Sequence, residues 1–172
     1  MLEPLPDYVA ELSALVRPGR IEYVRAAAGR TEDELPLLVP EAPGGSSFLA
    51  ASREHDTFFK RSVTVPVVPL SSLDIPPGPT LLELDVQGYE LEVLAGAAPM
   101  LDQVEVIIAE CSLYPFQQDI PLIHEVVQHV AELGYRVYDT ADAFRWPSGT
   151  LAQLDLVFVR HDSQLLEPGQ WE

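Results

Sequence analysis

The second half of the chain alternates between segments of strand pattern and segments of helix pattern, and this order restricts the folds open to it. A strand–helix–strand–helix–strand order favours an α/β sheet with parallel central strands, because each helix returns the chain to the same end of the sheet. The last strand follows its predecessor without a helix, which favours an antiparallel return. We therefore predict a mostly parallel sheet with one antiparallel strand near its edge. The expected strands are Thr80–Val86, Val104–Ala109, Tyr135–Tyr138 and Leu154–Val159, and the expected helices are Gln87–Ala95 and Asp119–Leu133.

The first half of the chain has weaker patterns. Apolar residues at helical spacing predict a helix over Pro6–Val16. Prolines around Leu35–Val39 restrict that segment to an edge strand. Gly44-Gly45-Ser46-Ser47 lacks the preceding strand and following helix of a phosphate-binding loop, so we interpret it as a flexible loop. Further along, Gly96 is expected to end the helix before it. Two more strands are expected over Ile21–Ala28 and Val63–Val68.

Composition predicts one globular domain over residues 1–172 and excludes some partners. With 47% hydrophobic residues, the chain can bury a core. The formal charge of -17, from 27 acidic and 10 basic residues, argues against nucleic acid as a partner. Cys111 is the single cysteine, which excludes an intramolecular disulfide. Neither a signal peptide nor a membrane-spanning apolar run is evident, so the expected location is the cytoplasm, away from the membrane.

Polar residues follow two of the predicted strands, at the points where parallel strands of an open sheet bind ligands. Asp85 and Gln87 follow the first of these strands, and Glu90 comes shortly afterwards. Glu110 ends the next strand, and Tyr114 lies just beyond it. These five residues are the first candidates for a functional site.

Structural roles remain open for several candidates. Asp85 is also suited to accept hydrogen bonds from loop amides or to cap the next helix, and Glu90 is suited to orient its own loop. Cys111 has the pattern of a buried core residue. Phe144 and Trp146 are candidates to cover an acceptor pocket, although aromatic residues commonly fill cores. The four histidines lack metal-ligand spacing, so no metal site is predicted.

The segment 81–97, with the sequence LLELDVQGYELEVLAGA, closely resembles the hallmark of the FkbM methyltransferase family. Supporting matches extend over nearly the whole chain. They are Ser46-Ser47, 65–74, Val106–Glu110, Leu113–Pro115, His124–Val126, Gly134–Asp139 and Leu154–Val159.

The resemblance implies a seven-stranded Rossmann-like sheet that binds S-adenosylmethionine. Leu2-Glu3-Pro4 resembles the end of the second strand of that sheet, where Glu3 would bind the ribose hydroxyls. Asp85 would lie beside the methionine moiety and the methyl acceptor, and Glu110 at the lip of the acceptor pocket. We predict Asp85 and Glu110 as catalytic residues; Glu3, Asp85 and Gln87 as cofactor contacts; and Glu90 and Tyr114 as acceptor contacts.

The chain departs from the family pattern at its N-terminus. The first strand and its glycine-rich turn precede the position of Glu3 in the family, so we expect residues 1–172 to cover the C-terminal two-thirds of the fold. A missing central strand leaves buried backbone groups unpaired. Three explanations stay open: a start that lies upstream, a second copy or another chain that completes the sheet, or a truncated remnant.

Two functions compete at this point. The first is transfer of a methyl group from S-adenosylmethionine to a hydroxyl of a small molecule or glycan. The second is a non-catalytic interaction module derived from a methyltransferase, which the missing loop favours. A nicotinamide-binding protein is a weaker third alternative, because the chain has no G-x-G-x-x-G motif after a strand.

Overall fold

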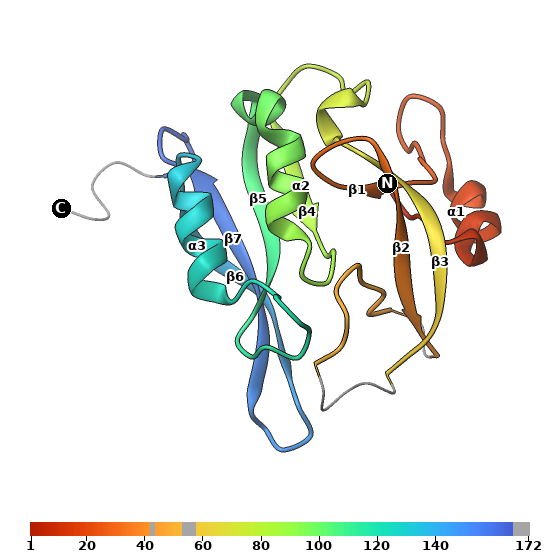
Figure 1. Ribbon diagram of the computed structural model, residues 1–172. Helices are drawn as coiled ribbons and strands as arrows, with labels where there is room; N and C mark the ends of the chain where they lie inside the picture. Colours follow the sequence, from red (N-terminus) through yellow and green to blue (C-terminus); the bar gives the residue numbers. More distant parts are fainter. Residues whose placement is uncertain (42–43, 53–57, 167–172) are drawn as a thin grey trace.

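The computed structural model describes residues 1–41, 44–52 and 58–166, which form a mixed α/β fold with two sheets. Figure 1 shows the two sheets side by side, with the C-terminal half of the chain in one and the N-terminal half in the other. The sequence analysis anticipated the α/β class but placed all strands in one sheet. None of the helices in the described ranges has the length and apolar character needed to cross a membrane.

The larger sheet has four strands in the order β4-β5-β7-β6. β4 and β5 are parallel, whereas β7 is antiparallel to both β5 and β6. β4, β5 and β6 therefore run in one direction and β7 runs in the other, which matches the predicted antiparallel strand next to the edge. The strands are β4 (Thr80–Leu84), β5 (Val104–Ser112), β6 (Tyr135–Arg145) and β7 (Leu151–Arg160).

Two helices, α2 (Glu90–Ala97) and α3 (Ile123–Glu132), lie side by side in front of this sheet in Figure 1. They bury the alternate residues of the strands beneath them, since successive side chains of a strand point to opposite faces. The main core joins these faces and includes Val93, Leu94, Ile107, Ala109, Val126, Val130 and Phe158. Two short 3₁₀ segments, η3 (Leu70–Ser72) and η4 (Ala98–Gln103), lead into β4 and β5 respectively.

The smaller sheet has the order β1-β3-β2, with β1 parallel and β2 antiparallel to the central β3. β2 is an edge strand, as its prolines predicted. The strands are β1 (Ala27–Ala28), β2 (Asp33–Pro40) and β3 (Phe59–Val68). The 3₁₀ turn η1 (Pro6–Tyr8) and helix α1 (Val9–Leu15) precede them, and a second core cluster includes Leu5, Leu37, Val39, Val65 and Val67.

Some predicted boundaries were wrong. The expected strand Ile21–Ala28 is reduced to β1, because the residues before it bond to the N-terminal segment and to Arg17 instead of to a sheet. Glu110 lies inside β5, which continues to Ser112. Asp119 does not begin α3; it has a positive φ of 57°, and the helix starts after Leu122, whose amide donates to the Glu125 carboxylate.

Gly96 lies inside α2 and does not end it. The reason is a close backbone approach: a Cβ at position 96 would lie 1.9 Å from the carbonyl oxygen of Gly29. Arg30, next to Gly29, forms a two-pronged ion pair with Glu92 of the same helix, at 2.9 and 3.0 Å. The segment that follows β1 is therefore held against α2, and this contact fixes the two sheets relative to each other.

β4 is the edge strand of the larger sheet on the side of the N-terminal segment. Within the described ranges, β5 is its only partner in the sheet. Leu81 and Glu83, which point to the face away from α2, are exposed, and Leu81 retains 57% of its surface. The backbone groups on the outer edge of β4 thus face a space and not another strand.

Candidate functional site

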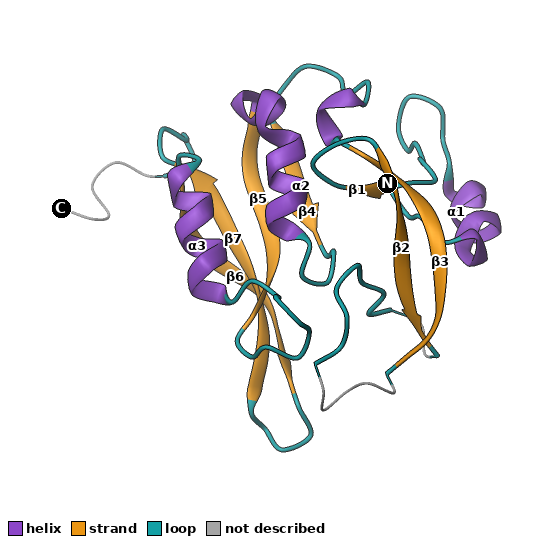
Figure 2. Ribbon diagram, in the orientation of Figure 1, coloured by secondary structure: helices purple, strands orange, loops and turns teal. Residues whose placement is uncertain are grey.

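The loops that follow β4 and β5 meet at one end of the larger sheet. In Figure 1 the carboxyl ends of β4, β5 and β6 point downward, and the helices α2 and α3 begin at the same end. Figure 2 shows the loops gathered there, among them residues 44–52, 85–89, 113–122 and 146–150. Ligands of open α/β sheets bind at this kind of end, so the site is built from these loops.

Gln87 connects the two predicted carboxylates. Its side-chain amide nitrogen donates to Oδ1 of Asp85 at 2.7 Å and to Oε2 of Glu110 at 2.9 Å. The backbone at Gln87 has a φ of 50°, a left-handed conformation that non-glycine residues rarely adopt. This turn brings the side chain of Gln87 from the loop after β4 back toward β5, so the loop is joined to Glu110 inside β5.

Glu110 has an unusual ionisation. Burial raises the pKa of its carboxyl group to about 8, with further contributions from the negative charges of Asp85, Glu90 and Asp155, while the hydrogen bond from Gln87 acts in the opposite direction. Asp155 lies directly opposite Glu110 on β7. Near neutral pH, Glu110 is thus a carboxyl group poised to exchange a proton with a bound molecule.

The buried side chain of Glu90 binds the backbone of the loop formed by residues 85–89. Its side chain is only 2% exposed, and its carboxylate accepts a hydrogen bond from the amide of Gly88 at 3.0 Å. Burial raises the pKa of Glu90 to about 7, and hydrogen bonds from backbone amides oppose the shift. At Gly88 φ is 96°, and a Cβ there would lie 2.7 Å from Cδ1 of Leu49 and 3.0 Å from Oε1 of Gln117. Only glycine fits this close approach of three loops.

Residues 47–48, which are distant in the sequence, contact the loop formed by residues 85–89. The hydroxyl of Ser47 donates to the carbonyl of Gln87 at 2.7 Å and accepts from the amide of Leu49 at 3.0 Å. The rings of Phe48 and Tyr89 pack with their centroids 4.8 Å apart. The Gly-Gly-Ser-Ser segment interpreted as a flexible loop is therefore part of the site.

A large cavity of about 870 Å³ lies between β4 and the N-terminal segment. Glu3, Asp85 and Gln87 all line it, together with Gly44 and Gly45. Its described wall is rich in acids, with Arg20 as the one basic side chain; the acids are Glu3, Glu22, Asp74, Glu83 and Asp85. Such a cavity favours a ligand that carries positive charge.

Glu3 reaches the cavity from the strand-like N-terminal segment, whose backbone pairs with that of Val24. Its carboxylate accepts a hydrogen bond from the amide of Leu5 at 2.8 Å, and burial raises its pKa. The hydroxyl of Tyr23 donates to the Glu3 carbonyl at 3.0 Å and fixes the backbone. Glu3 thus stands across the cavity from Asp85.

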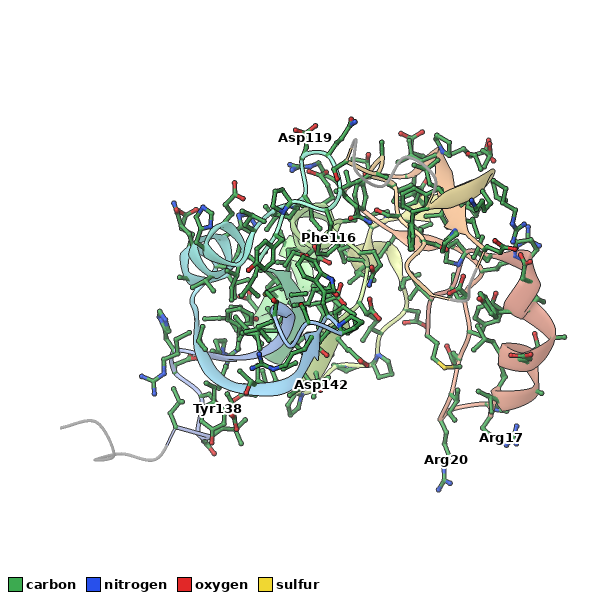
Figure 3. All side chains as sticks on the ribbon, turned by 90° about the horizontal axis from the view of Figure 1, so that it is seen from below. Arg17, Arg20, Phe116, Asp119, Tyr138 and Asp142 are labelled. Carbon is green, nitrogen blue, oxygen red and sulfur yellow. The ribbon has the colours of Figure 1, made fainter. Side chains whose placement is uncertain are left out.

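A second cavity, of about 320 Å³, lies on the other side of Gln87, which lines both cavities. Five aromatic side chains, Gln117, Gln153 and Ala51 complete its described wall, and none of these residues is charged. Figure 3 views the molecule from this end, with Phe116 toward the middle. The aromatic residues are Phe58, Phe59, Phe116, Phe144 and Trp146.

The structure therefore brings Asp85, Gln87 and Glu110 together, with Glu3 across the first cavity. Glu90, Glu110 and Tyr114 line neither described wall, so the predicted position of Glu110 at the lip of an acceptor pocket stays a prediction. Glu90 is buried below the loop, and the ring of Tyr114 packs against Trp146 at a centroid distance of 5.0 Å. Phe144 and Trp146 line the second cavity, as the candidates for an acceptor pocket would. Sequence reasoning missed Ser47, Gln117 and Gln153. Ser47 and Gln117 each adjoin a phenylalanine, which was their only signal, whereas Gln153 lies between Ala152 and Leu154 and had none.

Cys111 is buried next to this site, and burial raises the pKa of its thiol to about 12. Its Sγ lies 3.5 Å from the Ala109 carbonyl oxygen within the same strand. In the parts of the chain that the structure covers, no group of three or more histidine, cysteine or acidic side chains is placed to hold a metal ion.

Comparison with known proteins gives one family. The family model described as Methyltransferase FkbM domain matches residues 1–137, which is more than half of the chain. No curated protein and no solved structure matches. The matched range contains β4, β5, the loop with Asp85 and Gln87, and the residues from Met1 to Glu3, and it confirms the resemblance seen in segment 81–97. The chain therefore belongs to the FkbM methyltransferase family.

Proposed function

We propose that this protein transfers a methyl group from S-adenosylmethionine to a hydroxyl group of a small molecule or sugar. The observation that carries the proposal is the position of Gln87, which lines both cavities and bonds to Asp85 in the wall of the first cavity and to Glu110 on β5. A donor in the acidic cavity and an acceptor in the aromatic cavity would meet at this residue. Family membership supports methyl transfer as the reaction.

The acidic cavity suits S-adenosylmethionine in size and charge. Its volume of about 870 Å³ lies within the usual range for sites of small ligands. The sulfonium and ammonium groups are cations, which the surrounding carboxylates favour. Glu3, Gly44 and Gly45 line this cavity. Glu3 would accept hydrogen bonds from the ribose hydroxyls, and the two glycines would let the backbone approach the ligand closely.

When bound, S-adenosylmethionine supplies a methyl group made electrophilic by its positive sulfur. The acceptor oxygen would bond to that methyl group as the methyl–sulfur bond breaks and its electron pair stays on sulfur. In its charged form, which becomes the major form only above a pH of about 8, Glu110 would accept the proton that the hydroxyl loses. Gln87 holds Glu110 and Asp85 in fixed positions. Glu90 keeps the loop in place through the Gly88 amide. Positioning of the two reactants would supply much of the rate acceleration.

We also propose that the four strands β4-β5-β7-β6 are part of a seven-stranded Rossmann-like sheet. In the active protein, a further strand would pair with the free edge of β4, supplied by chain that precedes Met1 or by a second chain, which includes a second copy of this one. Such a strand would occupy part of the space between β4 and the N-terminal segment and bring a glycine-rich turn to the donor cavity. Slow hydrogen exchange of the β4 amides that point away from β5, measured in the assembled protein, would support pairing with this further strand.

The competing function is a non-catalytic interaction module, and the free edge of β4 favours it, because an unpaired edge is a ready surface for another chain. The two functions differ in one property that is easily measured. A methyltransferase binds S-adenosylmethionine, whereas a module that only docks through β4 does not. In either case, we expect the protein to act in the cytoplasm, because its single cysteine suits a reducing compartment.

Calorimetric titration of S-adenosylmethionine into the full-length chain tests the proposal. We expect binding in the micromolar range, weakened about tenfold by Glu3→Gln and by Asp85→Asn, because each removes one polar interaction in the cavity. Glu11→Gln, which removes a charge from exposed α1, is the matched control and should leave the affinity unchanged. A well-folded chain that does not bind S-adenosylmethionine would refute the idea that residues 1–172 bind the donor without a further strand, and would favour the interaction module.

A further inference from the structure

The larger sheet has one face that no described helix covers. Both α2 and α3 lie in front of the sheet in Figure 1 and pack on the strand residues that point toward them. The alternate residues of the same strands point to the other face, which we call the open sheet face. Its apolar members are only half-buried or exposed, although neighbouring parallel strands are normally covered on both faces. They are Leu81 of β4, Val106 and Ile108 of β5, and Val157 of β7.

Acidic side chains accompany these apolar residues on the open sheet face. Glu83 lies on β4, and Asp155 of β7 lies opposite Asp142 of β6. Burial raises the pKa of Asp155, and the negative charges of Asp85, Asp142 and Glu83 raise it further, so these carboxylates lie within electrostatic reach of one another. Among the described residues, no ion pair includes Glu83, Asp142 or Asp155. A polypeptide that covers this face should therefore bring basic as well as apolar side chains.

The N-terminal half of the chain presents a segment of this kind. Residues 15–21, which we call the arm, comprise the end of α1 and a tight turn closed by two backbone hydrogen bonds between Arg17 and Ile21, at 2.9 and 2.8 Å. Leu15 and Ile21 are 51% and 37% exposed, and α1 buries none of its residues. Arg17 and Arg20 are exposed, and in the described ranges neither forms an ion pair. The arm thus combines exposed apolar surface with two positive charges.

The arm and the open sheet face lie on the same side of the molecule. In Figure 3, Arg17 and Arg20 lie toward the lower edge of the view, as does Asp142 of β6, whereas α3 lies toward the upper edge. Within the described part of the chain, no hydrogen bond or ion pair joins the arm to the larger sheet of the same molecule. Two copies related by a twofold axis can place each arm on the sheet of the other copy, so that the same contact forms twice.

We infer that two copies of this chain form a symmetric dimer in which the arm of each copy docks on the open sheet face of the other. Leu15 and Ile21 cover the apolar residues of that face, and Arg17 and Arg20 pair with its carboxylates. The inference is independent of the proposed methyl transfer and does not use the free edge of β4. An anionic membrane is the less suitable partner, because it would attract the two arginines but repel a chain with a net charge of -17.

Sedimentation equilibrium of the full-length chain over a range of concentrations tests the inference, and we expect a reversible dimer. Two variants with reversed charges identify the contact. The arm variant combines Arg17→Glu with Arg20→Glu, and the sheet variant combines Glu83→Lys with Asp142→Lys, all at exposed positions. Each variant alone places like charges at both contacts, so its dimer dissociation constant should rise by about a hundredfold or more.

An equimolar mixture of the two variants should restore the dimer. In the mixed pair, one contact joins acidic arm residues to basic sheet residues, and the other contact joins the native charges. Circular dichroism establishes beforehand that each variant is folded. Failure of the mixture to dimerise, when both folded variants are monomers, would overturn the inference. A dimer that neither variant weakens would also overturn it and would indicate pairing elsewhere, such as at the edge of β4.

A pair of leucine variants tests the apolar part of the contact and remains informative if a charge variant does not fold. Leu81→Ser should weaken the dimer about tenfold, because Leu81 lies on the open sheet face. Leu165→Ser, at a leucine that is 52% exposed outside the sheet, should leave the dimer unchanged. A chain that is monomeric at every concentration would contradict the inference. If that monomer bound vesicles of anionic lipid through Arg17 and Arg20, the arm would be assigned to a membrane instead.

Discussion

Gln87 lies 2.7 Å from Asp85 and 2.9 Å from Glu110, measured from its amide nitrogen to one carboxylate oxygen of each. The two hydrogens of that amide therefore each point at a different carboxylate. A glutamine in this place keeps two acidic groups close together without adding charge. The pKa of Glu110 reflects the balance between burial and neighbouring negative charges, which raise it, and this hydrogen bond, which lowers it.

Replacing Gln87 with leucine should raise the pKa of Glu110 above about 8, because the hydrogen bond that favours the charged form is lost. Titration of the Glu110 carboxyl carbon by NMR measures the change. Gln128→Leu is the control, since Gln128 bonds only to Glu132 on the exposed side of α3. An unchanged or lower pKa in the Gln87→Leu variant would show that the observed bond does not govern the ionisation.

A comparison of Gly96→Ala with Gly134→Ala tests how much the close contact at position 96 affects the free energy of unfolding. Alanine at a helix interior normally stabilises by about 1 kcal/mol relative to glycine. At position 96 the new Cβ would meet the Gly29 carbonyl oxygen, so we expect a loss of about 3 kcal/mol in the free energy of unfolding. At Gly134, where φ is 92° and nothing lies within 4 Å, only backbone strain of about 1 kcal/mol applies. Urea denaturation compares them, and an equal or smaller loss at 96 would argue against the close contact.

Stability should fall as the pH rises from about 5 to about 9. Glu90 and Glu110 have folded-state pKa values of about 7 and about 8, above their ordinary value of 4.5. The folded protein therefore binds more protons than the unfolded chain between these values, so its free energy of unfolding decreases with pH until about 8 and then levels off. Denaturation at several pH values checks the direction.

Glu110→Gln and Glu90→Gln should each flatten part of this slope. Glu110→Gln removes the portion that extends to about pH 8, and Glu90→Gln the portion that ends near pH 7. Glu132→Gln, on the exposed side of α3, should leave the slope unchanged. A stability that rises over this range in the unmodified protein would contradict the ionisation assigned to both carboxyl groups.

Cys111 should not react with thiol reagents in the folded protein. The residue is fully buried, and a pKa of about 12 leaves almost no thiolate at neutral pH. Ellman's reagent should therefore release colour only after the chain is unfolded in guanidinium. Rapid modification in native buffer would mean that the region around β5 opens far more often than its packing implies.

Much of the larger sheet was predictable from the sequence, because apolar runs such as 104–109 have the length of buried strands and glycine marks the end of a helix at 134. The proximity of Asp85 to Glu110 was also predictable, since both were expected at the carboxyl ends of neighbouring parallel strands. Several strands were predicted too short. β6 continues to Arg145 through exposed, mostly polar residues that carry no apolar pattern, and β7 begins at Leu151 because its first residues pair with the end of β6.

Other features depend on contacts between distant segments and leave no local pattern. Gly96 had the position of a helix terminator, yet its role is set by Gly29. Gln117 was an unremarked loop residue until the backbone pairing of Ala51 placed it in a cavity. The bridge made by Gln87 requires a left-handed backbone that sequence patterns do not favour for glutamine.

The shared position of Gln87 in both cavity walls has a thermodynamic consequence. Two ligands that contact the same side chain do not bind independently, because the first ligand fixes the side-chain orientation to which the second ligand binds. Whatever factor a donor molecule imposes on the affinity for the acceptor, the acceptor must impose on the affinity for the donor. Titrating either ligand in the presence of the other measures this coupling from both directions, and the two values have to agree.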